Sequence, residues 1–282
     1  MLDFSNVTGT SRRGRTPIGI ILIVWAGTAW GQDAAELVRK STEHDQQNFE
    51  RLKNYTYQQR METRSLDSKG KVTSAESKTN EVVILVGRPY DKLIAKDDKP
   101  LPEKEAKLEQ EKLDKEFAKR SRLSAEEAAK LEKEREADRK YLREVPDAYD
   151  FRLLGQDTVS GKPAWIVQAD PKASFKPRDS QAKVLSKVRA KFWIDKKDLQ
   201  WVKMEAEVID TIALGLSMVR IAPGGILSFE QTHVNDDVWL PARFSVKAGA
   251  RLALLFNRQM EIDAIYSGYK KFQSDSRVVA AK

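Results

Sequence analysis

Most of this chain alternates between apolar and polar residues, and short turns separate the alternating stretches. The clearest case is residues 188–208, where two stretches carry apolar side chains at every second position. Such a pattern predicts strands with one covered and one solvated face, which is typical of antiparallel sheets. We expect about ten strands, and a single sheet of that many strands has to curl. The fold class that follows is α+β, with a strongly curved antiparallel β-sheet as its body.

The segment 188–208 also predicts a register. Bringing its two apolar faces together favours a hairpin in which Trp193 lies directly opposite Trp201, with Lys196–Asp198 as the loop. A slip by one residue would turn one apolar set outward, which disfavours that alternative.

A curled sheet has a concave apolar face, and that face needs a cover. Residues 33–53 predict a helix with apolar side chains along one side and Asp33 as its N-cap, and we expect this helix to pack on the concave face. Residues 211–222 are apolar nearly all round, so they predict either a short buried helix or a central strand. The residues expected to line the concave face, from their shared parity on the predicted strands, are Tyr55, Tyr57, Met61, Phe151, Trp165, Val167, Phe192, Ile194, Met204 and Phe244.

Residues 102–145 interrupt the strands with a charged segment. It holds 13 acidic and 13 basic residues, many in acid-to-base pairs four positions apart, and it predicts two exposed helices that meet near Arg120–Ser124. Ser124 and Glu127 have the spacing of a capping box. Because the apolar stripe of this segment is thin, we expect a protruding helical pair that the sheet does not need for folding. The pair is either a solvated insertion without a task or a partner-binding arm.

The N-terminal segment predicts export from the cytoplasm. Three arginines at positions 12–15 precede the apolar run Ile18–Trp30, which is shorter than the 20 or so residues that span a bilayer. Small residues on both sides of Trp30 predict cleavage before Gln32. The chain has no cysteine, so no disulfide supports the fold. The expected organisation is a signal peptide at 1–31, a single domain at 32–272 that contains the insertion, and a loose tail at 273–282.

The sequence contains few of the residues and motifs that catalytic or metal-binding sites use. Its two histidines, His44 and His233, fall on separate predicted elements, and common phosphate-loop, zinc-protease and serine-hydrolase motifs do not occur. We therefore expect no enzyme activity, no metal and no cofactor. The net charge of +8 is a mild excess, which in an exported protein favours a basic surface near anionic envelope components over nucleic-acid binding.

The order of helix, antiparallel meander and hairpin KFWIDKKDLQWVKMEAEV, residues 191–208, resembles the periplasmic lipoprotein carriers of the LolA and LolB type and related periplasmic sigma-factor regulators. Residues 230–244 and 266–272 are similar to envelope proteins described as outer-membrane lipoprotein-sorting-like. The resemblance implies an incomplete β-barrel, or half barrel, in which acyl chains bind between the concave face and a helical lid. The lid would be residues 33–53, with 211–222 as a second candidate. The family has no catalytic residues.

We expect a periplasmic binding protein for a hydrophobic ligand, a lipid or a lipoprotein acyl chain, which acts as a carrier or sensor without catalysis. It would be a monomer, with at most a peripheral contact to the membrane. The alternative is an envelope interaction protein that binds a protein partner through residues 102–145 and has a filled core. The space beneath helix 33–53 separates the two hypotheses, because a carrier needs roughly 300 Å³ or more.

Overall fold

The computed structural model describes residues 27–137, 139–214, 219–235, 238–252 and 256–272. Most of the predicted signal peptide and the whole predicted tail lie outside these ranges. Within the described residues, no helix is both long enough and apolar enough to cross a bilayer.

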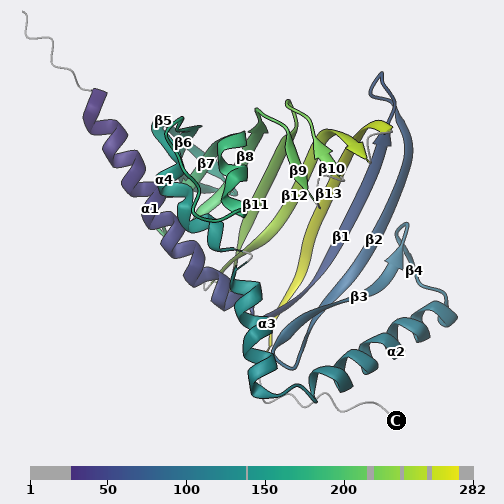
Figure 1. Ribbon diagram of the computed structural model, residues 1–282. Coiled ribbons are helices and arrows are strands. Elements are labelled where there is room, and N and C mark those ends of the chain that lie inside the picture. Colours follow the sequence, from purple (N-terminus) through teal and green to yellow (C-terminus); the bar gives the residue numbers. More distant parts are fainter. Residues whose placement is uncertain (1–26, 138, 215–218, 236–237, 253–255, 273–282) are drawn as a thin grey trace, which may run out of the picture.

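The body of the protein is one open antiparallel sheet with 11 strands in the order β4-β3-β2-β1-β13-β12-β11-β8-β7-β6-β5, curved as Figure 1 shows. The strands are β1 (Tyr55–Leu66), β2 (Val72–Leu85), β3 (Arg88–Lys96), β4 (Lys99–Pro100), β5 (Tyr149–Val159), β6 (Lys162–Pro171), β7 (Val188–Asp195), β8 (Trp201–Val208), β11 (Ile226–Val234), β12 (Val238–Leu252) and β13 (Phe256–Lys271). The helices are α1 (Gly27–Leu52), α2 (Glu103–Arg120), α3 (Ala125–Ala137) and α4 (Val145–Ala148), with 3₁₀ turns η1 (Lys140–Glu144) and η2 (Gln181–Lys187). The predicted fold class, an α+β incomplete barrel, is confirmed.

Strand pairing separates an apolar face from a charged one. One continuous row crosses seven strands and consists of Val167, Phe192, Met204, Phe229, Phe244, Ala264 and Met61. Neighbouring positions on the other face form ion pairs, such as Arg243 with Asp263 at 2.7 Å and Lys247 with Glu261 at 2.8 Å. The alternation in the sequence therefore predicted correctly that Met61, Val167, Phe192, Met204 and Phe244 share a face.

The helix expected on the concave face is present as α1, which begins at Gly27 rather than at residue 33. Figure 1 shows α1 running across one half of the sheet, over β5 to β8. Ala34 and Val38 are buried in the same apolar cluster as Phe192 and Ile194 of β7, so α1 is a cover over that half of the concave face.

The predicted register of the β7–β8 hairpin is wrong by two residues. Val188 pairs with Val208, and Trp193 pairs with Lys203 rather than Trp201. The loop is longer than predicted, because the Asp195 carboxylate accepts hydrogen bonds from the backbone N–H groups of residues 197 and 198 and stabilises a wider turn. A shift of two keeps every side chain on its face, so alternation alone does not detect it. An irregularity next to this turn then places Trp201 opposite Ile194, on the concave face.

The described residues of 211–222 form neither the helix nor the central strand that were predicted. Residues 212–214 and 219–221 are two short strands, β9 (Ile212–Leu214) and β10 (Val219–Ile221), which pair with each other. β10 also pairs with β12, beside the main path of the sheet. The described part of the second candidate for a helical lid is therefore a pair of short strands.

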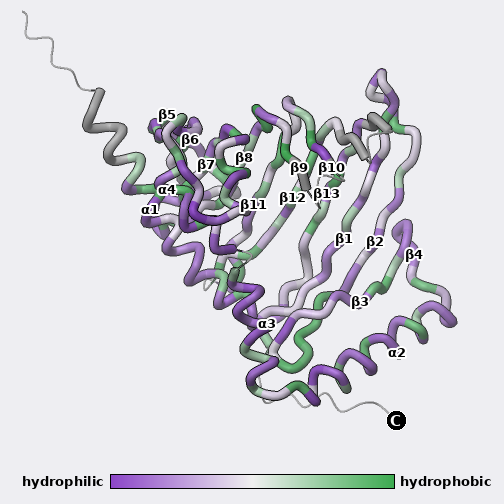
Figure 2. The backbone as a smooth tube through the Cα atoms, in the orientation of Figure 1, coloured by the Kyte–Doolittle hydropathy of each residue, from purple (hydrophilic) through white to green (hydrophobic). Residues whose placement is uncertain are grey.

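The charged segment forms the two predicted helices, α2 and α3, and none of their described residues is buried. Figure 2 shows hydrophilic residues over much of both helices. The capping box is confirmed: Ser124 N–H donates to Glu127 at 2.8 Å, and Glu127 N–H donates to the Ser124 hydroxyl at 3.2 Å.

The segment does not simply protrude, however. β4 and β5 are the two opposite edges of the sheet, so the chain between them has to cross from one edge to the other (Figure 1). Arg120 of α2 donates hydrogen bonds to the carbonyl oxygens of Arg88 and Pro89, and Glu132 of α3 pairs at 2.5 Å with Lys53, the residue directly after α1. The segment is therefore a strap between the two edges, held at both ends.

Candidate ligand cavity

An apolar cavity of about 190 Å³ lies between α1 and the concave face of the sheet. Its roof is α1, its floor is formed by β7, β8 and β11, and its side is closed by η1, α4 and η2. The lining residues are Val38, Ser41, Thr42, Asp45, Tyr141, Leu142, Val145, Tyr149, Val184, Leu185, Val188, Ala190, Phe192, Ile194, Trp201, Met204, Ala206, Ile212 and Leu227.

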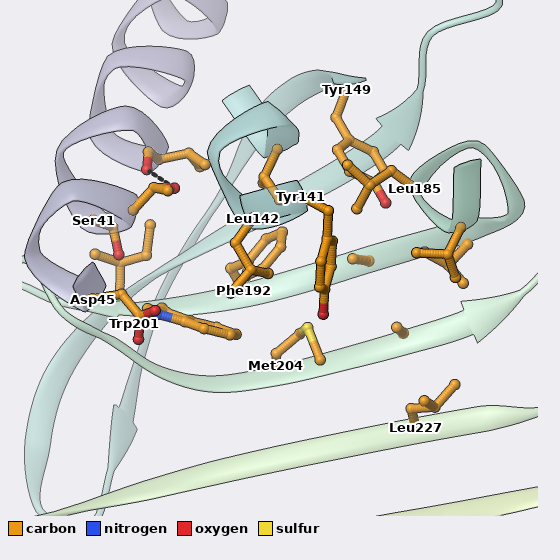
Figure 3. Close-up of a pocket in the computed structure, with 18 of the residues that line it drawn as sticks. Ser41, Asp45, Tyr141, Leu142, Tyr149, Leu185, Phe192, Trp201, Met204 and Leu227 are labelled. Atoms are coloured by element: carbon orange, nitrogen blue, oxygen red, sulfur yellow. Dashed lines mark hydrogen bonds between the residues drawn. The ribbon is translucent and has the colours of Figure 1, made fainter. Parts of the chain in front are cut away.

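The floor of the cavity follows from strand alternation. Phe192 and Met204 are directly paired across β7 and β8, and Ala206 pairs with Leu227 across β8 and β11. The alanines at 190 and 206 leave room that larger side chains would fill. Figure 3 shows Tyr141 and Leu142 from η1 above Phe192 and Met204 of the sheet. Aromatic and aliphatic side chains thus surround the space on several sides.

A second cavity of about 220 Å³ adjoins the first and continues along the concave face toward β12. Asp45, Tyr141, Leu142, Trp201 and Met204 line both spaces. Phe229 and Phe244 extend the apolar floor into the second space. Each cavity alone is smaller than the roughly 300 Å³ at which small-molecule pockets begin, whereas their summed volume reaches that size class. We refer to the two adjoining cavities together as the trough.

One charged group, Asp45 of α1, lies between the two cavities. Its side chain is 9% exposed, and it pairs with Arg139, which is 34% exposed, at 2.5 Å. Gln200 Nε2 also donates to its carboxylate at 3.2 Å. Burial raises the pKa of Asp45 above its ordinary value, and the attraction of Arg139 only partly offsets that effect. The carboxylate therefore destabilises the cover in its charged form.

We predict that Asp45→Asn stabilises the protein at pH 7. A folded-state pKa above the ordinary value of 3.8 means that the folded state binds the proton more readily, so wild-type stability falls as pH rises through that range. Asparagine keeps a hydrogen-bond acceptor at position 45 but carries no charge, so the variant avoids this loss of stability. The melting temperature of the variant should exceed that of the wild type at pH 7, and the difference should vanish below pH 3.8. Glu43→Gln, which changes an exposed acid on the same helix, is the control. Its melting temperature should equal that of the wild type at pH 7.

The structure brings together some of the residues predicted to line the concave face. Phe192, Ile194 and Met204 line the first cavity, and Met204 and Phe244 line the second. Phe151 and Val167 are buried in the same apolar cluster without lining either space. Trp165 pairs with Ile194 on the same face, and the Lys196 ammonium lies 3.8 Å from the centre of its ring.

The predicted residues on β1 lie away from both cavities. Tyr55 is buried in a separate cluster with Val238 and Leu240. The Tyr57 ring lies 5.3 Å from that of Tyr269, and burial raises the pKa of Tyr57 to about 12. Met61 continues the apolar row beyond the part of the sheet that α1 covers, and it is half-buried.

Several lining residues were missing from the prediction, for identifiable reasons. Trp201 was assigned to the other face, because alternation does not reveal the irregularity between β7 and β8 beside the turn. Tyr141 and Leu142 belong to the thin apolar stripe of the charged segment, which was not expected to pack against the sheet. Val38 was assigned to the buried side of the predicted helix, but the sequence does not show which strands that helix covers. Leu185 lies in η2, outside the predicted strands and helices.

The cavities contain no arrangement typical of metal-dependent chemistry. No group of three or more histidine and acidic side chains that could hold a metal ion occurs among the described residues. Asp45 is the acidic side chain that lines both cavities, and its hydrogen bonds are to fixed neighbouring side chains.

Comparison with known proteins gives distant structural matches. No protein-family model and no curated protein matches the chain. A DUF1329 family protein from Desulfovibrio piger is 12% identical, with 88% of this chain and 95% of that chain covered and a TM-score of 0.34. A putative outer membrane lipoprotein-sorting protein domain from Vibrio parahaemolyticus is 14% identical, with 86% and 95% covered and a TM-score of 0.32. A LolA superfamily protein from Nitrosomonas europaea is 12% identical, with 88% and 97% covered and a TM-score of 0.30.

The structural neighbours thus include DUF1329 and LolA-superfamily lipoprotein-sorting proteins, the group that the hairpin motif resembles. At these identities and TM-scores the matches are distant. The description of the fold rests on the strand pairing of this chain itself.

Proposed function

We propose that this protein is a periplasmic binding protein that takes an apolar chain, from a lipid or a lipoprotein, into the trough between α1 and the concave face, without catalysis. The observation that carries the proposal is the apolar cavity beneath α1, which is lined by helices and strands on several sides and adjoins a second space. The periplasmic location in this proposal follows from the predicted export signal.

Burial alone gives such a site its affinity. Each methylene group removed from water contributes about 0.8 kcal/mol. About ten buried methylenes would therefore contribute about 8 kcal/mol, which corresponds to a Kd on the order of 1 µM before the cost of ordering the chain. Asp45 and Ser41 form a polar strip on the roof, which limits how far a hydrocarbon can fill the space on the helix side.

The direct test is uptake of a dansyl-labelled fatty acid by the purified protein. We expect saturable binding with a Kd in the micromolar range and a blue-shifted emission, because the dye enters an apolar site. Lipid extracted from protein purified out of the periplasm should contain fatty acyl chains at up to one equivalent. Absence of both signals would contradict the proposal.

A second candidate function is favoured by one observation on the strap. Leu108, Phe117 and Leu131 are 48%, 52% and 40% exposed on α2 and α3. Exposed large apolar side chains mark protein contact sites where they form one contiguous patch. An envelope interaction protein would use these side chains, and that role becomes the favoured one if the purified protein binds no fatty acid.

A further inference from the structure

A polar cleft of about 420 Å³ lies on the flank of α1, beside the turn between β7 and β8. Its walls come from α1, from the β7–β8 loop, and from β11 and β12. The lining residues are His44, Gln47, Asn48, Arg51, Lys197, Asp198, Leu199, Gln200, His233 and Trp239. The four residues from α1 are spaced three and four apart, so they share one face of the helix. Both histidines of the chain line this one space.

The cleft is held together by hydrogen bonds around Trp239. The Trp239 backbone N–H donates to Asn48 Oδ1 at 2.9 Å, and Asn48 Nδ2 donates to the Trp239 carbonyl oxygen. The indole Nε1 of Trp239 donates to Asp198 at 3.1 Å. These contacts join α1, the β7–β8 loop and β12, and the Asp195 hydrogen bonds fix the loop from its other side. The walls are therefore in place before any ligand arrives.

The charges of the cleft favour an anion. Arg51 and Lys197 are cationic, and Asp198 is the acidic group among the described lining residues. The Asp198 carboxylate accepts the Trp239 hydrogen bond and lies 3.8 Å from His233 Nε2. The described lining therefore has an excess of cationic over acidic side chains, and a concave site with such an excess concentrates counter-ions. Its volume lies in the range of small-molecule sites rather than that of a single ordered ion.

We propose that this cleft binds a phosphate- or carboxylate-bearing group, with Lys197 and Arg51 as its cationic contacts and the two histidines beside them. The source of that group is a soluble anion or the headgroup of an anionic lipid. The site is separate from the apolar trough, because the paired Asn48–Trp239 contacts stand between the cleft and the nearer cavity. Anion binding and fatty-acid uptake are therefore independent properties of the protein.

The chain offers a reporter for this site, since its two histidines both line the cleft. Untagged protein is labelled on its histidine rings, and the two ring signals are followed by NMR during titration with inorganic phosphate. We expect saturable shifts of both signals, because the anion would bind beside Lys197 and Arg51 in the space that both rings line.

Charge reversal supplies the variant and its control. Lys197→Glu changes an exposed side chain of the cleft and leaves both reporters in place, and it should weaken phosphate binding at least tenfold. Lys69→Glu, in the exposed turn at the far end of β1, makes the same charge change and should leave binding unaltered. Equal melting temperatures of the three proteins establish that each is folded.

A second titration separates the two sources of the anion. If phosphate leaves the signals unchanged, phosphatidylglycerol vesicles should still perturb them, phosphatidylcholine vesicles should not, and Lys197→Glu should abolish the effect; the ligand is then a lipid headgroup. The proposal is overturned if neither probe perturbs the histidine signals, or if Lys69→Glu reduces binding as much as Lys197→Glu.

Discussion

Replacing Ala206 with tryptophan is expected to lower fatty-acid uptake by at least tenfold while the sheet stays folded. Ala206 is 5% exposed and lies on the floor of the cavity, paired with Ala190 on one side and Leu227 on the other. An indole at this position would project into the space beneath α1 and exclude an acyl chain. The measurement is the affinity for a dansyl-labelled fatty acid, together with the melting temperature of the variant.

Glu207→Trp is the matched control, because the next residue of β8 points to the charged face and is exposed. It adds the same ring to the same strand and should leave uptake unchanged. If Ala206→Trp instead unfolds the protein, and the wild type never binds lipid, the cavity is part of an ordinary packed core. The carrier function would then be wrong, and the strap would become the candidate site.

Removing residues 103–144 is expected to prevent folding when the ends are joined by four residues. The strands on either side, β4 and β5, are separated by the whole sheet, about 48 Å along its curve at about 4.8 Å per strand. A four-residue linker reaches about 18 Å from residue 102 to residue 145. The short deletion therefore has to pull an edge strand out of the sheet or uncover the cavity. Loss of a cooperative thermal transition is the expected result.

A flexible Gly/Ser linker as long as the deleted segment is the control for this experiment. Its average span is about 36 Å, enough to cross the mouth of a curved sheet. This variant should unfold cooperatively, at a lower temperature than the wild type, because the contacts of Arg120 and Glu132 are lost. Wild-type stability of the short deletion would show that the strap is a dispensable protrusion after all.

The sequence was informative where the pattern is local. Alternation identified that Phe192, Ile194, Met204 and Ala206 of β7 and β8 share a face, and the Ser124–Glu127 spacing identified a helix start inside the charged segment. It could not show that the hairpin register is shifted by two, because that shift preserves both faces. It also could not show the order of the strands, which depends on contacts between distant segments.

The candidate site was predicted in part for the same reason. Phe192, Ile194 and Met204 were found from parity, and they form the floor of the cavity. The roof and side depend on where α1 and η1 come to lie, and no local pattern specifies that. His44 and His233 looked unrelated on their separate elements, and only the packing of α1 beside β11 and β12 brings them to one cleft.

The pairing of β1 with β13 has a consequence for how the protein folds. These strands occupy the middle of the sheet, yet Leu66 pairs with Gln259, nearly 200 positions later in the chain. Closing a loop of about 200 residues costs about 2.5 kcal/mol more entropy than closing one of 12. The two flanks, β1 to β4 and β5 to β8, consist of local hairpins and can form early. The centre of the sheet cannot be completed until β13, the last strand of the chain, pairs with β1 and β12. Folding should therefore be slow and limited by one late event, the insertion of β13 between β1 and β12.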